Sequence, residues 1–122
     1  MFIDTELKSF GESIGIKNLH LNDKGCIKFS FENDRSLFLE KNDEKIYFFI
    51  LKEFPLGPLP FSLYQKALTE CNHQQNYPFT IQAVAKTDHD IGYLTSLQDN
   101  ECDQPTLYKI FEFLLQKIDA LN

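Results

Sequence analysis

Residues 26–51 constrain the fold of this chain more than any other stretch. They hold three runs of apolar, aromatic and β-branched residues, separated by polar turns at 32–35 and 42–44. This pattern predicts three consecutive β-strands that form an antiparallel meander. The third run is apolar on both faces over residues 46–51. Because such a strand must be covered on both sides, we expect helices of the same chain or a second chain on each face.

Three segments carry apolar residues at the spacing of an amphipathic helix. They are residues 3–16, which end at Gly15, residues 61–72, and a segment that follows the N-cap Asp103 and runs to residue 121. The apolar stripe of the second segment is narrow and includes the small residue Ala67. Small residues let two helices approach closely, so this helix is a candidate centre of a subunit interface. Ordinary packing on its own sheet is the competing interpretation.

The remaining strands are predicted at residues 79–86 and 91–97, which form a second hairpin around a polar turn. The order is then helix, three strands, helix, two strands, helix. A doubly wound parallel sheet needs a regular alternation of strand and helix, which is missing here. We therefore predict an α+β fold with helices packed on a twisted antiparallel sheet. A single domain over residues 1–122 is expected, because a chain of this length can bury a core of its own.

The charge of the chain limits its partners. The 12 basic residues are scattered and are outnumbered by 18 acidic ones, so the net charge is −6. We expect no nucleic acid and no anionic membrane as partner, because both require clustered Lys and Arg. The N-terminal residues lack the basic and long apolar segments of a secretory signal, and the three cysteines are odd in number and widely spaced. These features favour a cytoplasmic protein with reduced thiols.

No group of residues in the sequence indicates catalysis or a cofactor. His20, His73 and His89 occupy strand-start, loop and turn positions, where a surface histidine is the usual interpretation. Cys71 and His73 are the only close Cys/His pair, and a zinc site would need a second pair at ligand spacing. The acidic pairs fall in turns without the dense oxygen ligands of a calcium loop. We therefore predict a non-enzymatic protein without a metal or cofactor.

In the order of its elements the chain resembles the class I type III secretion chaperones, the Tir-chaperone family. The residues that carry the resemblance extend over essentially the whole chain: Phe10, Gly11 and residues 14–16 at the end of the first helix, residues 21 and 25–29 at the start of the sheet, residues 37–40, the connector 56–60, and Leu107, Phe111 and Leu115 in the last helix. Their order and spacing together make the signal.

The resemblance implies a non-enzymatic dimer in the bacterial cytoplasm. It would bind the extended N-terminal segment of one or more effector proteins and keep that segment competent for secretion. A homodimer is expected, and a heterodimer with another chaperone stays open. An extended peptide suits such a protein, because it can satisfy a sheet edge with main-chain hydrogen bonds and place alternate side chains in apolar pockets.

Two sets of residues are predicted to carry these contacts. The dimer interface is expected at Leu63, Tyr64, Ala67, Leu68, Cys71 and Val84. Exposed apolar positions that would line the effector track are expected at Phe2, Leu7, Phe29, Phe31 and Phe38.

Two alternatives remain. One is a regulatory or adaptor domain of the same fold that binds a folded protein. The other is a small hydrolase or ligand-binding enzyme, which is disfavoured because no nucleophile, base and orienting group can be placed together.

Overall fold

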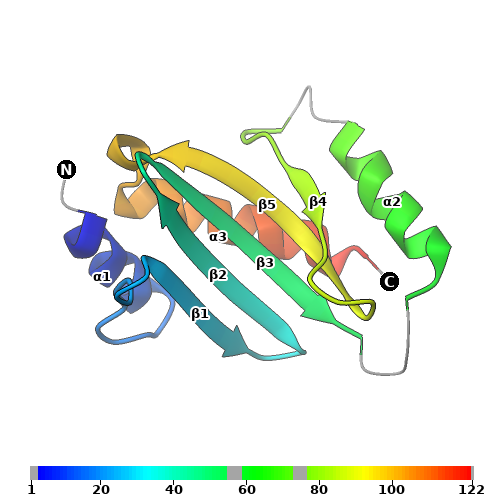
Figure 1. The fold of residues 1–122 in the computed structure, drawn as a ribbon, viewed down its shortest axis with the longest axis horizontal. Helices are drawn as coiled ribbons and strands as arrows, with labels where there is room; N and C mark the ends of the chain where they lie inside the picture. The colour runs from blue at the N-terminus through cyan, green and yellow to red at the C-terminus, as the bar shows by residue number, and fades with distance from the viewer. Residues whose placement is uncertain (1–2, 55–58, 73–76, 122) are drawn as a thin grey trace.

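The computed structural model describes residues 3–54, 59–72 and 77–121, and its elements follow the predicted order (Figure 1). The helices are α1 (Ile3–Ser13), α2 (Phe61–Asn72) and α3 (Gln104–Asp119), with a 3-10 turn η1 at Asp99–Glu101. The strands are β1 (Cys26–Phe31), β2 (Arg35–Asn42), β3 (Lys45–Glu53), β4 (Gln82–Val84) and β5 (Asp90–Gln98). They form one antiparallel sheet in the order β1-β2-β3-β5-β4. The predicted α+β fold is confirmed. His73 and residues 56–58 of the connector lie outside the described residues.

Helix α1 and strand β4 are shorter than predicted, for local reasons. Helix α1 ends at Ser13, whose hydroxyl donates a hydrogen bond to the carbonyl of Phe10, and Gly15 follows with a φ of +87°. Strand β4 spans three residues because the backbone on either side of it bonds to side chains. The Thr80 carbonyl accepts from the Thr95 hydroxyl, and the Lys86 amide donates to the Asp90 carboxylate.

One face of the sheet, called the inner face, packs against α1 and α3 to form the main core. Phe48 of β3 is fully buried there, with its ring 5.8 Å from that of Phe10 of α1. Gly11 lets the segment after α1 pack closely on the helix, because a Cβ atom at this position would stand 2.7 Å from the Cβ of Leu19. The inner face therefore fixes where α1 and α3 lie relative to β1.

The opposite, outer face of the sheet carries a second, smaller apolar cluster. The rings of Phe38 and Phe49 stack at 4.9 Å, and Leu51 lies buried beside them. The Lys86 ammonium stands 4.2 Å from the centre of the Phe38 ring, and Lys28 stands 5.6 Å from it. Lysine stems can cover apolar surface while their charged ends stay in water. The expectation that this face of β3 needs a helix or a second chain is therefore wrong, because the chain covers it by itself.

Candidate peptide-binding groove

Strand β1 lies at one edge of the sheet and pairs only with β2. The Gly25 carbonyl accepts a hydrogen bond from the Lys41 amide of β2 at 2.8 Å. Backbone groups in a strand point to alternate sides, so those of residues 27, 29 and 31 turn towards β2. Those of Lys28 and Ser30 therefore turn towards the open edge.

This open edge is closed off at both ends by the chain itself. Asn22 occupies both backbone groups of Cys26. Its backbone amide donates to the Cys26 carbonyl at 2.9 Å, and its side-chain oxygen accepts from the Cys26 backbone amide at 3.0 Å. At the other end, the Arg35 Nε donates to the carbonyl of Glu32 at 3.0 Å. The exposed edge is thus limited to the backbone groups of Lys28 and Ser30, enough for a short added strand.

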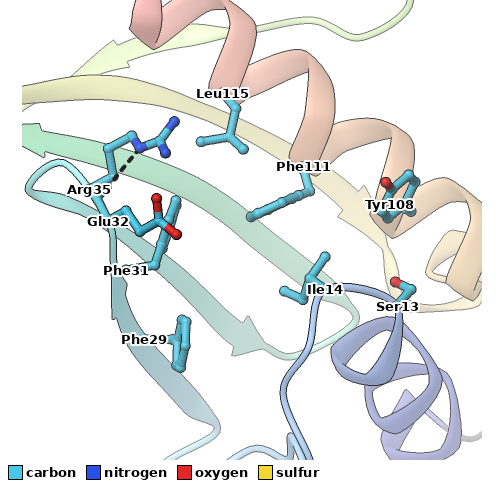
Figure 2. A pocket seen from close by; sticks show the side chains of 9 residues that line it. All are labelled: Ser13, Ile14, Phe29, Phe31, Glu32, Arg35, Tyr108, Phe111 and Leu115. Atoms are coloured by element: carbon cyan, nitrogen blue, oxygen red, sulfur yellow. Dashed lines mark hydrogen bonds between the residues drawn. The ribbon is translucent and has the colours of Figure 1, made fainter.

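An open groove of about 330 Å³ runs beside this edge, between β1, the end of α1 and α3 (Figure 2). Its apolar lining comes from all three elements, and the ring of Phe31 lies 5.8 Å from that of Phe111. The residues around the groove are Ser13, Ile14, Phe29, Phe31, Glu32, Arg35, Tyr108, Phe111 and Leu115. A side chain that enters from the strand edge would meet mainly aromatic and aliphatic carbon.

An ion pair holds the groove together at its polar end. The Arg35 Nη1 contacts both carboxylate oxygens of Asp119, at 3.1 and 3.0 Å. The guanidinium also lies 5.0 Å from the centre of the Phe31 ring. This arrangement ties the start of β2 to the end of α3 and leaves Arg35 engaged on three sides.

The structure places the predicted effector-track residues in different environments. Phe29 and Phe31 lie together in the groove. Leu7 is 1% exposed and belongs to the main core, while Phe38 is 9% exposed in the outer-face cluster. These two residues were expected to be exposed, and that expectation is wrong, because Leu7 packs within the main core and Phe38 stacks on Phe49 beneath Lys86. Phe2 lies outside the described residues.

Sequence reasoning missed the helical half of the groove. The spacing assigns Ile14, Phe111 and Leu115 only to the apolar stripes of their helices, with Phe111 and Leu115 also among the marks of the resemblance, and it makes no prediction for Tyr108. A signal was present in the last helix, because its apolar residues spread over more than one helical face. The buried stripe consists of Leu107, Ile110, Leu114 and Ile118, and Phe111 and Leu115 lie outside it. The surplus apolar residues indicate a second contact surface.

Helix α2 divides the predicted interface residues into buried and exposed groups. Ala67 is 0% exposed and Leu63 is also buried, both within the core of this chain. Their prediction as interface residues is corrected, because they face their own sheet. Leu68 is 58% exposed and Phe61, which was not predicted, is 73% exposed. Tyr64 and Cys71 are partly buried against the main core, whereas Val84 packs on the outer-face cluster.

Three titratable groups of the described chain, His89, Cys71 and Cys102, have pKa values shifted by their surroundings. His89 is bonded by Asp88 and by Glu53, and these contacts raise its pKa. Burial raises the pKa of the Cys71 thiol, and that of Cys102 to about 12, which disfavours the nucleophilic thiolate. Within the described ranges, no group of three or more His, Cys, Asp and Glu side chains is placed to hold a metal ion.

Comparison with known proteins decides the family. A family model described as the Tir chaperone protein (CesT) family matches residues 5–122. The chain belongs to this family. The resemblance found in the sequence is confirmed, and with it the predicted class of function, a type III secretion chaperone. No curated protein sequence matches this chaperone.

Solved structures share the fold of this chaperone at low sequence identity. It is similar to a chain of the Yersinia pestis secretion chaperone SycH in complex with a fragment of YscM2, at 18% identity and a TM-score of 0.70, with 98% of this chain and 99% of that chain covered. It is also similar to a chain of the ExsC–ExsE complex, at 12% identity and a TM-score of 0.75, covering 97% and 89%. A chain of the HopA1–SchA chaperone–effector complex matches at 21% identity and a TM-score of 0.67, covering 96% and 90%.

None of the helices in the described ranges is long and apolar enough to cross a membrane.

Proposed function

We propose that this chaperone binds an extended segment of an effector protein along β1, with alternate side chains in the groove, and keeps that segment unfolded for secretion. The observation that carries the proposal is the coincidence of an open strand edge with an apolar groove on its inner side. Neither feature alone would favour an extended ligand over a folded one. Together they match strand addition, in which the main chain supplies hydrogen bonds and pockets select side chains.

The contributions fit a reversible complex. Each main-chain hydrogen bond to Lys28 or Ser30 is expected to add a net ~1 kcal/mol. Each large apolar side chain buried against Phe31 and Phe111 adds about 1.5–3 kcal/mol. Ordering an extended segment offsets part of this gain. The effector is thus held tightly enough to stay unfolded and loosely enough to be released.

A homodimer through the exposed face of α2 would complete the assembly. Leu68 and Phe61 present large apolar side chains on that face, next to the partly buried Tyr64 and Cys71. Pairing two copies would cover this surface and give one long effector segment two grooves, which raises its overall affinity. We place the complex in the bacterial cytoplasm, before secretion, with no enzymatic step.

The strand edge can be tested with a proline. Ser30→Pro removes an amide that points away from β2 and blocks an added strand, while the ladder to β2 keeps its bonds. Ser30→Ala is the matched control, since both changes remove the bond between the Ser30 and Ser36 hydroxyls. The ligand is an effector fragment captured from the bacterial cytosol, identified by mass spectrometry and trimmed by proteolysis.

Titration calorimetry with this fragment should show affinity at least about tenfold weaker for Ser30→Pro. The variant loses the hydrogen bond of the Ser30 amide, ~1 kcal/mol, and its ring obstructs the added strand. Ser30→Ala should bind like the unchanged protein. Equal affinity of the proline variant would refute strand addition at β1. A captured partner that binds only in folded form would instead favour the adaptor alternative.

A further inference from the structure

Among the described residues that line the groove, Glu32 carries a charge that is not in an ion pair. Its carbonyl is taken by Arg35, and its exposed carboxylate lines the groove beside Phe31 (Figure 2). Among the residues that the structure describes, no side chain pairs with this carboxylate. The basic residue of the groove, Arg35, is already bound to Asp119. A ligand in the groove therefore meets one unpaired negative charge and no available positive one.

The surroundings of Glu32 suit a long basic side chain. The near-parallel rings of Phe29 and Phe31, with centroids 6.3 Å apart, line the groove with apolar carbon next to Glu32. Lys and Arg can lay their aliphatic stems along such a surface while the charged end reaches an acid. Glu32 would repel an acidic ligand side chain at the same place. Such a side chain could bind Arg35 only if it displaced Asp119, whose two carboxylate oxygens both accept from the Arg35 Nη1.

We propose that the groove selects effector segments in which a Lys or Arg stands within two positions of an apolar residue that enters the groove, and that Glu32 pairs with this basic residue. The inference rests on the proposed function, because it needs an extended ligand along β1. It adds a specificity that the apolar lining cannot provide, since carbon surface does not distinguish a basic neighbour from an acidic one.

The test is a selection from a library of random peptides that are displayed on their own messenger RNA. About ten residues suffice, because an extended chain rises ~3.3 Å per residue. The unchanged protein, Glu32→Gln and Asp34→Asn are used as baits. Asp34 is the matched control, because it lies in the same turn, carries the same charge and lines a pocket with Lys28 and Phe38 on the outer face. Asparagine also tolerates the positive φ of 60° at that position.

The unchanged protein and Asp34→Asn should both enrich peptides with alternating apolar residues. In these peptides, Lys or Arg next to the apolar residues should be about two- to fivefold more frequent than in the starting library, because an exposed ion pair contributes little free energy. Glu32→Gln should keep the apolar alternation and lose the basic enrichment. Apolar alternation without basic residues, or basic enrichment that persists in Glu32→Gln, would overturn this inference alone. Baits that enrich no apolar alternation would overturn the proposed groove as well.

Discussion

The outer face of β3 and the open edge of β1 both suggest a need for a partner, but the chain itself covers only the outer face of β3. On the outer face, Phe38, Phe49 and Leu51 form an apolar cluster that Lys86 and its turn already cover. At the edge, the backbone groups of Lys28 and Ser30 that turn away from β2 pair with no other strand that the structure describes. Apolar content alone therefore does not reveal a binding surface. The proposed function rests instead on an open strand edge beside an uncovered groove.

The largest expected effect is a difference in how strongly substitutions on the two surfaces lower the free energy of unfolding. Phe38→Asp should lower the free energy of unfolding by at least about 3–5 kcal/mol, because it removes a buried ring and introduces a charge into its place. Phe31→Ser, in the partly exposed groove, should cost only about 1–2 kcal/mol and yet abolish effector binding. Urea denaturation and calorimetry measure the two quantities. Similar destabilisation by both changes would remove the distinction.

Helix α2 allows the same comparison between its two sides. Ala67→Glu should destabilise the chain by roughly 3 kcal/mol or more, because the carboxylate would enter the core. Leu68→Glu, on the exposed side, should leave the helical circular dichroism unchanged and convert the proposed dimer to a monomer. Light scattering gives the mass of each variant. A Leu68→Glu protein that stays dimeric would exclude this face as the interface.

A smaller effect tests how the outer face is covered. Lys86 stands 4.2 Å from the Phe38 ring and 5.1 Å from the Phe49 ring, whereas Lys28 contacts Phe38 at 5.6 Å. Lys86→Ala should therefore lower the free energy of unfolding by about 1 kcal/mol, and Lys28→Ala by less. Equal losses in denaturant titrations would show that Lys86 has no special part in covering the rings.

The smallest effect concerns the turn that carries Lys86. The hydrogen bond to Asp88, and to a smaller extent the one to Glu53, raises the pKa of His89 above its ordinary value of 6.5. A group whose pKa is raised by folding stabilises the folded state fully below its unfolded pKa and loses this effect as the pH rises through its folded pKa. The melting temperature of wild type should thus exceed that of His89→Gln most below about pH 6.5 and approach it at alkaline pH. A difference that grows with pH would contradict the assignment.

Local patterns predicted most of the fold. The N-cap Asp103 accepts from the Thr106 amide at 2.9 Å, as its residue type and position indicated. Period-two alternation placed Phe29 and Phe31 on one face correctly. Such signals succeed because they depend on neighbours in the chain.

Features that depend on distant segments could not be predicted in the same way. The burial of Phe38 depends on Lys86, which comes from another hairpin. The stripe of α2 showed which residues share a face, but not that Ala67 faces its own core. The sequence marks Phe111 as apolar surface beside the buried stripe of α3, but only the packed structure shows that it borders a groove together with Phe31.

Hydrogen exchange at single residues tests the central claim most directly. Amide exchange of Lys28 and Ser30 is measured by nuclear magnetic resonance, with and without the captured effector fragment. We predict fast exchange in the free protein, because both amides face solvent, and strong slowing in the complex. Slowing confined to other parts of the protein, with Lys28 and Ser30 unchanged in the saturated complex, would contradict strand addition at β1.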